Sequence, residues 1–192
     1  AEYLHFDVMD GMFVSNISFG IPVLASIKDA ADIVMDVHLM IEEPIRYVEA
    51  FHKAGADILN VHYEACEDVQ ATLDAIHKCG MKAGLTIKPA TPVDVLKPYL
   101  EQAELFLIMS VEPGKGGQSF IPESLDKIRE LRGLLNEKGL TADVEVDGGI
   151  HLGNAKEVLE AGANVLVAGS AVFKDNIAEN VKGFMEILNE NE

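Results

Sequence analysis

Residues 143–170 read DVEVDGGIHLGNAKEVLEAGANVLVAGS and contain a complete strand–helix–strand unit. A short β-type run, Asp143–Val146, precedes a helical run over Asn154–Ala161 and a second β-type run, Val165–Ala168. Strands separated by one helix in this way form parallel βαβ units. Gly148 and Gly149 come after Asp147 at the end of the first run and Gly169 directly follows the second, which indicates turns where backbone N–H groups can approach an anion closely.

The same alternation extends over the rest of the 192 residues. Five further strands are expected at Tyr3–Val8, Ile33–Met40, Ile58–Tyr63, Lys82–Ile87 and Leu105–Val111. Helices are expected at Pro44–Ala54, Val69–Cys79, Val93–Ala103, Pro122–Lys138 and Asn176–Asn189. No linker or low-complexity segment interrupts the pattern, so residues 1–192 are predicted to form a single domain.

Three features favour an α/β fold of the (β/α)8 TIM-barrel class over an open doubly wound sheet. Polar residues lie at the C-terminal ends of nearly all strands, no GxGxxG motif opens the first turn, and glycines follow the late strands. The count of seven strands is one short of a closed barrel. We therefore expect the chain to lack the first strand and helix, a βα unit of roughly 20–30 residues ahead of Ala1.

Composition restricts the class of partner. The chain has 15 Lys and Arg against 32 Asp and Glu, a formal charge of −17. Such a field repels nucleic acid and anionic membrane surfaces, so neither is expected as a partner. No apolar run approaches the ~18 residues of a transmembrane helix. Cys66 and Cys79 cannot form a disulfide scaffold and are expected as free thiols, which favours a reducing, cytoplasmic location.

Two neighbouring strands end in histidine and carboxylate side chains. Alternate residues of a strand face the same side, so His5, Asp7 and Met9 share one face. Asp36, His38 and Met40 share the corresponding face of the next strand. Two imidazoles and a carboxylate from adjacent parallel strands predict a site for a divalent metal ion.

Glycine-rich turns follow three of the later strands. Gly148 and Gly149 come directly after the carboxylate of Asp147, and Gly169-Ser170 follows the last strand, where barrel enzymes bind phosphate. The segment Met109–Gln118 has three glycines within four positions, which indicates a mobile loop that closes over a ligand.

Two further polar features lie at strand ends and leave alternatives open. His62 and Glu64 could support the packing around the metal site or contact the ligand directly. Lys88, just before a proline, could reach the pocket or cap the mouth of the barrel.

Four motifs together resemble the ribulose-phosphate 3-epimerase family, and the resemblance covers essentially the whole chain. They are His5-Phe6-Asp7-Val8-Met9-Asp10-Gly11, Asp36–Met40, Met109–Gln118 and Val146-Asp147-Gly148-Gly149. The resemblance implies a metal-dependent barrel isomerase of the pentose phosphate pathway. Its reaction would be epimerisation at C3 of D-ribulose 5-phosphate to give D-xylulose 5-phosphate. The family commonly forms dimers or larger assemblies, so a homo-oligomer is expected.

The resemblance also implies roles for individual residues. One divalent ion (Zn²⁺, Fe²⁺, Mn²⁺ or Co²⁺) would be held by His5, Asp7, His38 and Asp147. Asp7 and Asp147 would exchange protons with the two faces of an enediolate, one as base and the other as acid. The phosphosugar substrate would contact His38, Met109, Gly114, Lys115, Gly116, Gly117, Gly148, Gly149, Gly169 and Ser170.

Four positions depart from the family's usual pattern, although none matches a metal or acid/base position. They are Met12, Ser15, Lys88 and Lys115, which stand where the family commonly has His, Pro, Asn and Phe. One alternative is therefore a 3-epimerase for a six-carbon 2-ketose 6-phosphate such as D-allulose 6-phosphate. Another is a non-catalytic phosphosugar-binding barrel. A decarboxylase or synthase of the phosphate-barrel type would need a DxKxxD-like run, and Asp7–Asp10 contains no lysine.

Overall fold

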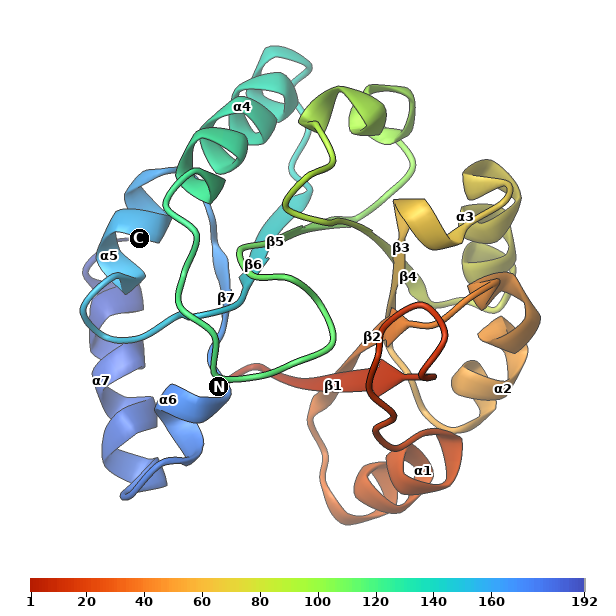
Figure 1. Cartoon of the computed structure of the whole chain (residues 1–192), viewed down its shortest axis with the longest axis horizontal. Coiled ribbons are helices and arrows are strands. Elements are labelled where there is room, and N and C mark those ends of the chain that lie inside the picture. The colour runs from red at the N-terminus through yellow and green to blue at the C-terminus, as the bar shows by residue number, and fades with distance from the viewer. Residues whose placement is uncertain (192) are drawn as a thin grey trace.

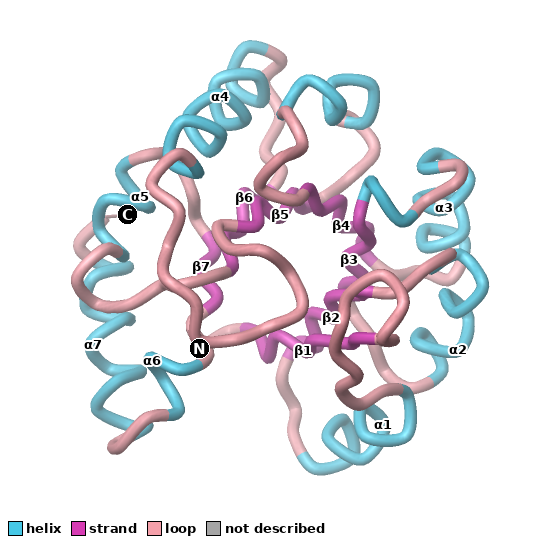
Figure 2. The backbone as a smooth tube through the Cα atoms, in the orientation of Figure 1, coloured by secondary structure: helices cyan, strands magenta, loops and turns pink. Residues whose placement is uncertain are grey.

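The computed structural model describes residues 1–191 and shows a ring of parallel strands surrounded by helices. Figure 1 and Figure 2 view this ring from the end at which the loop between β5 and α4 lies in front of the strands. The strands follow chain order around the ring, and all neighbours are parallel. They are β1 (Tyr3–Met9), β2 (Val34–Met40), β3 (Ile58–His62), β4 (Lys82–Ile87), β5 (Leu105–Met109), β6 (Asp143–Asp147) and β7 (Val165–Val167).

The helices pack around the outside of the ring (Figure 2). The α-helices are α1 (Ile21–Ala30), α2 (Val48–Lys53), α3 (Val69–Lys78), α4 (Ser124–Glu137), α5 (Ala155–Glu160), α6 (Ser170–Phe173) and α7 (Ile177–Asn189). Three 3₁₀ helices are η1 (Pro44–Tyr47), η2 (Tyr63–Ala65) and η3 (Val93–Tyr99). None of the helices in residues 1–191 is long and apolar enough to cross a membrane.

The apolar core lies mainly between the ring and its helices. Residues such as Leu39, Leu59 and Leu85 point outward from the strands and pack with Leu73 and Ile76 of α3, all fully buried. Strands covered on both faces read as nearly continuous apolar runs, as parallel sheets do. A smaller cluster from Ile58, Leu105, Leu107, Met109 and Val111 fills part of the ring's interior.

The prediction of a parallel barrel and of seven strands is confirmed, and the strand ends agree within two residues. One predicted helix is confirmed only in part, and another is wrong in kind. The run Pro44–Ala54 divides into η1 and α2, and Val93–Ala103 forms only the 3₁₀ helix η3, which contains Pro98. Proline lacks the N–H that an α-helix needs and its ring clashes with the preceding turn.

Two other helices differ from the prediction, one in its first residue and one because it was not expected. The helix predicted from Pro122 begins at Ser124. Helix α1 was not among the expected helices. It begins after Gly20, with Pro22 in its first turn, and fills the connection between β1 and β2. The proline in the first turn is the sequence signal that could have located it.

The ring is open between β1 and β7, which do not pair within the described residues. A cavity of about 720 Å³ follows this seam, lined on one side by residues of β1 and on the other by β7 and α7. Apolar side chains such as Leu4, Leu166 and Phe184 face it. Both strand edges carry free backbone hydrogen-bonding groups along the seam. The expected eighth strand therefore stays a prediction, and the seam is where it would pair.

We expect a chain that carries one more parallel strand and its covering helix ahead of Ala1 to be more stable than residues 1–192 alone. The strand would satisfy the free edges and bury the apolar seam, and each kcal/mol gained raises Tm by about 2–4 °C in a domain of this size. Thermal unfolding and amide hydrogen exchange on β1 and β7 would measure the effect. Unchanged Tm and unchanged exchange on both strands would contradict the prediction.

Candidate metal centre and active site

Four predicted side chains meet at the C-terminal ends of the strands. His5 and Asp7 come from β1, His38 from β2 and Asp147 from β6. One potential ligand atom from each lies within 4.8 Å of all the others. The parallel register produces this arrangement, because it pairs Asp7 with His38 and places His5 two residues earlier on the same face.

His5 directs one ring nitrogen into the cluster and uses the other to fix its own orientation. Its Nδ1 lies 2.5 Å from Oδ2 of Asp36, a hydrogen bond between neighbouring strands. Its Nε2 is buried and has no hydrogen-bond partner among residues 1–191, although Oδ1 of Asp7 lies 3.3 Å away. A buried nitrogen without a partner, surrounded by carboxylates, is an open ligand position.

His38 also turns one ring nitrogen into the cluster and has the other held from behind, but here Nδ1 points into the cluster and Nε2 is held. Its Nδ1 lies 2.9 Å from Oδ1 of Asp7, inside the cluster. Its Nε2 lies 2.8 Å from Nε2 of His62 on β3. Each histidine therefore turns one nitrogen toward the cluster while its second nitrogen is held from behind.

The donor set fits a divalent cation. Two imidazole nitrogens and two carboxylates suit Zn²⁺, Fe²⁺, Mn²⁺ and Co²⁺. Ligand bonds of about 2.0–2.2 Å place donor atoms within roughly 4.4 Å of one another. The observed limit of 4.8 Å is wider by only a few tenths of an ångström, so side-chain adjustment alone would close the cluster around an ion.

The charges of the cluster favour binding of a cation, and they shift the pKa values of the two carboxylates in opposite directions. Burial lowers the pKa of His5, but the negative charges of Asp36 and Glu145 outweigh it and raise this pKa well above its usual value. Burial likewise raises the pKa of Asp7, yet hydrogen bonds from His38 and His5 bring it far below its usual value. Burial raises the pKa of Asp147, and the charge of Asp7 raises it further. Asp7 is thus the more acidic member of the pair.

A second polar layer lies beneath the cluster and was not predicted as part of the site. Asn60 Nδ2 donates to Oδ1 of Asp36 at 2.6 Å, and Oε1 of Glu145 lies 3.4 Å from Nδ1 of His5. Burial and the neighbouring Asp36 raise the pKa of Glu145 well above its usual value. Gly84 makes room for this layer, because a Cβ there would lie 1.6 Å from Asn60 Oδ1. The alternation of strand residues was the available signal, since Glu145 precedes Asp147 by two positions.

A pocket of about 120 Å³ opens directly above the cluster. Its lining includes Asp7 and Asp147 and all the expected substrate-contact residues except His38, namely Met109, Gly114, Lys115, Gly116, Gly117, Gly148, Gly149, Gly169 and Ser170. His38 is fully buried beneath it. Met9 and Met40 complete an apolar wall with Met109.

Two loops form the rim of this pocket and are tied to each other. The loop after β5 lies in front of the ring in Figure 1. The Ser110 hydroxyl donates to the carbonyl oxygen of Gly148 at 2.7 Å, and the Ser110 N–H donates to that of Asp147 at 2.8 Å. A Cβ on Gly149 would lie 2.3 Å from the backbone nitrogen of Phe120, and its φ is +66°. Only glycine fits this contact between the loops.

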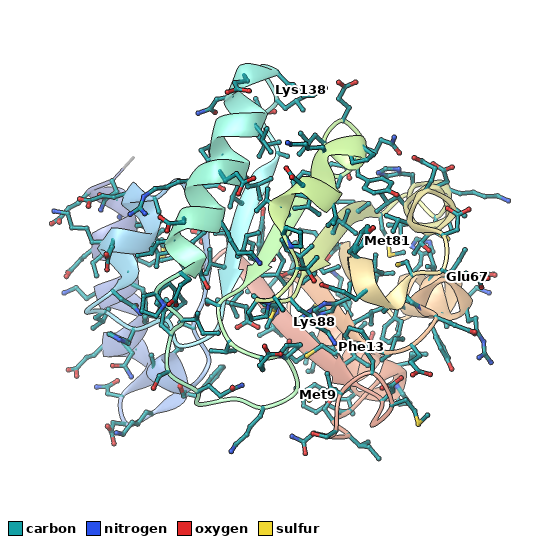
Figure 3. All side chains as sticks on the ribbon, turned by 45° about the horizontal axis from the view of Figure 1, so that its top comes forward. Met9, Phe13, Glu67, Met81, Lys88 and Lys138 are labelled. Carbon is teal, nitrogen blue, oxygen red and sulfur yellow. The ribbon has the colours of Figure 1, made fainter. Side chains whose placement is uncertain are left out.

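Lys88 stays outside the pocket lining and packs at the barrel mouth instead. Its Nζ lies 3.9 Å from the centroid of the Phe13 ring, a cation–π contact. Figure 3 shows the two labelled side chains beside each other. Of the two alternatives for Lys88, the structure therefore favours capping the mouth.

Comparison with known protein sequences gives evidence on the family of this chain that is independent of the site's geometry. A sequence model described as "Ribulose-phosphate 3 epimerase family" matches residues 1–173. This chain belongs to the ribulose-phosphate 3-epimerase family. It is 52% identical to the ribulose-phosphate 3-epimerase of Synechocystis sp. over 186 residues, which are 95% of this chain and 81% of that protein. It is 49% identical to the ribulose-phosphate 3-epimerase of Bacillus subtilis over 174 residues, 90% of this chain and 80% of that one.

Comparison with solved structures supports the barrel fold of this epimerase-family chain. Phosphoribosyl anthranilate isomerase from Thermus thermophilus superposes with a TM-score of 0.70 at 19% identity, covering 100% of this chain and 90% of that one. A 3-hexulose-6-phosphate synthase gives a TM-score of 0.70 at 18% identity, covering 96% and 99%. At these identities the likeness shows the fold alone.

We expect His5→Ala and His38→Ala to lose the bound divalent ion while the fold persists. Removing a ligand should weaken metal affinity by more than the roughly 10–100-fold that loss of a supporting partner costs. Metal analysis after dialysis, with circular dichroism as the check on folding, measures both effects. His52→Ala is the matched control, because His52 is exposed on α2. Full occupancy in both cluster variants would rule out these histidines as ligands.

Proposed function

We propose that this protein is a metal-dependent enzyme that interconverts D-ribulose 5-phosphate and D-xylulose 5-phosphate by inverting C3. The observation that carries the proposal is the meeting of Asp7 and Asp147 at the floor of one glycine-rimmed pocket. Membership of the ribulose-phosphate 3-epimerase family supports it. We also propose a homo-oligomer, which the family resemblance implies, and a cytoplasmic location, which the free thiols Cys66 and Cys79 favour.

Inversion next to a ketone needs two groups, because the C3 proton leaves from one face and a new proton arrives at the other. Asp7 and Asp147 supply these groups from strands that are distant in the sequence. The lowered pKa of Asp7 suits a base, and the raised pKa of Asp147 suits a proton donor. In the reverse reaction the two residues exchange roles.

The cluster also has to stabilise the negative charge that develops on the planar enediolate. His5, Asp7, His38 and Asp147 would hold the divalent ion, which supplies positive charge beside the substrate oxygens when bound. Because both acid/base carboxylates belong to the ligand set, they are held close to the reacting carbon. Asp36 and His62 fix the two imidazole rings from behind.

The rim of the pocket orients the substrate. Backbone N–H groups of Gly148, Gly149, Gly169 and Ser170 are available to the phosphate at the end of the barrel where such sites occur. Lys115, on the loop after β5, adds a positive charge at the rim. Met9, Met40 and Met109 provide an apolar wall that excludes water from the reacting carbon. Remote binding of the phosphate thus aligns C3 with the two carboxylates.

Asp7→Asn and Asp147→Asn should each reduce turnover by at least about 10²–10⁴-fold, because inversion stalls when either proton-transfer group is missing. The D-ribulose 5-phosphate epimerase assay measures the effect, and metal content is determined in parallel because both residues are ligands. Asp143→Asn, at the opposite end of β6, is the control and should keep near-normal turnover. A cluster variant that retains its metal and its activity would show that its carboxyl group transfers no proton.

Family membership favours a five-carbon over a six-carbon substrate, because the named relatives are ribulose-phosphate 3-epimerases. A six-carbon substrate would have to place one more carbon and its hydroxyl among the loops that line the pocket. Accommodating or losing one such group changes relative kcat/KM by about 10–200-fold. D-ribulose 5-phosphate should therefore be converted at least about tenfold more efficiently than D-allulose 6-phosphate. The opposite preference would favour the six-carbon 3-epimerase, and tight binding of both without turnover would indicate a binding protein.

A further inference from the structure

His62 is a buried histidine that belongs neither to the cluster of four nor to the pocket lining. It is fully buried on β3, and both of its ring nitrogens make polar contacts. Its Nε2 lies 2.8 Å from Nε2 of His38, and its Nδ1 lies 3.2 Å from Oε2 of Glu64. His38, His62 and Glu64 therefore form a continuous chain, called here the His62–Glu64 relay, that leads outward from the cluster.

The outer end of the relay can only accept hydrogen bonds. Oε1 of Glu64 accepts the N–H of Lys88 at 2.8 Å and the hydroxyl of Thr91. Burial raises the pKa of Glu64, but hydrogen bonds from His62, Thr91 and Lys88 lower it to about 2, so the group is a carboxylate. A carboxylate has no hydrogen to donate. The hydrogen in the contact between Glu64 and His62 therefore lies on Nδ1 of His62.

This assignment determines the hydrogen on the next ring. A neutral imidazole carries one hydrogen, so Nε2 of the buried His62 is left with its lone pair. Two nitrogens 2.8 Å apart need one hydrogen between them, and it must come from Nε2 of His38. Nδ1 of His38, which lies 2.9 Å from Oδ1 of Asp7, is then the nitrogen whose lone pair a divalent ion in the cluster would take.

We propose that Glu64, acting through His62, is a positioning residue that fixes the tautomer of His38 required for metal binding. The inference rests on the proposed metal centre. Histidine ligands commonly have their second nitrogen held by a carboxylate or carbonyl, which sets the tautomer and the ring orientation. In this chain one more imidazole lies between the carboxylate and the ligand.

Packing holds the relay in one geometry. The Phe13 ring lies 4.8 Å from the His62 ring, centroid to centroid, and Lys88 covers Phe13. Lys88 therefore contacts the relay directly through its N–H on Glu64, and its side chain covers the Phe13 ring that packs on His62. These contacts prevent His62 from rotating away from His38, so the hydrogen pattern depends on Glu64.

Glu64→Gln tests the relay without changing its shape. The N–H of Lys88 and the hydroxyl of Thr91 require an acceptor, so the amide oxygen of the new side chain faces them and its NH₂ group faces His62. Nδ1 of His62 must then accept, its Nε2 carries the hydrogen, and Nε2 of His38 loses its own. We expect affinity for Zn²⁺, measured by chelator competition, to fall about 10–100-fold.

The matched control is Glu104→Gln. Glu104 also accepts a backbone N–H, that of Ala83 at 2.8 Å, and contacts a histidine, His77, at 3.0 Å. It lies just before β5, at the end of the barrel away from the cluster. The zinc affinity of the Glu104→Gln variant should equal that of the wild type.

The second readout is the ¹⁵N chemical shifts of the imidazole rings, recorded without metal. In the wild type, Nε2 of His38 and Nδ1 of His62 should show the shifts of protonated nitrogens, and in Glu64→Gln both should show those of unprotonated ones. If that variant fails to fold, His62→Gln and His62→Leu replace it. In His62→Gln the amide oxygen can accept the hydrogen bond from Nε2 of His38. This variant should therefore retain most of the zinc affinity that His62→Leu loses.

Three results would overturn the inference. They are unprotonated Nε2 of His38 in the wild type, unchanged shifts and zinc affinity in Glu64→Gln, or an equal loss in the Glu104→Gln control. Failure of the wild type to bind zinc would instead count against the proposed metal centre, and the shifts would still report on the relay.

Discussion

The parallel pairing of β1 with β2 is the constraint on which the site depends. It pairs His5 with Asp36 and Asp7 with His38. On this face of the sheet, each histidine therefore has a carboxylate beside it on its own strand and another opposite it on the neighbouring strand. A shift of β1 by one residue would turn His5 and Asp7 out of the barrel and away from Asp36 and His38, because strand residues alternate between faces. The apolar outward-facing residues of the same strands, such as Phe6 and Val37, oppose such a shift because they are buried against the helices.

This register places an unusual number of ionisable groups inside the barrel. Asp36, His38, His62 and Glu145 are all almost completely buried. Buried charges destabilise a fold unless each finds a partner, and here hydrogen bonds link them into layers. Nε2 of His5 and Oδ1 of Asn60 are buried atoms of these layers that have no hydrogen-bond partner within the described residues. A divalent ion in the cluster would give Nε2 of His5 a partner, so folding and metal binding depend on the same residues.

The sequence predicted the fold and the upper part of the site well, because strand alternation alone brings His5, Asp7 and His38 onto shared faces. Asp147 needed the resemblance to a family, since nothing local shows that β6 comes close to β1. The layer of Asp36, Asn60 and Glu145 was not predicted as a unit because its hydrogen bonds join strands up to 85 positions apart in sequence, as from Nδ2 of Asn60 to Oε2 of Glu145. Segment Val93–Tyr99 has the apolar spacing of an α-helix, but it forms the 3₁₀ helix η3 because Pro98 lacks the N–H that an α-helix needs.

In the proposed reaction, two carboxylates on opposite faces of the substrate exchange protons at C3. The most direct measurement follows the early turnovers of the metal-loaded enzyme with D-ribulose 5-phosphate in D₂O. The account predicts D-xylulose 5-phosphate that carries deuterium at C3, while the remaining substrate keeps its hydrogen, because the proton removed by one residue does not return through the other. Product that retains the original C3 hydrogen would contradict the account.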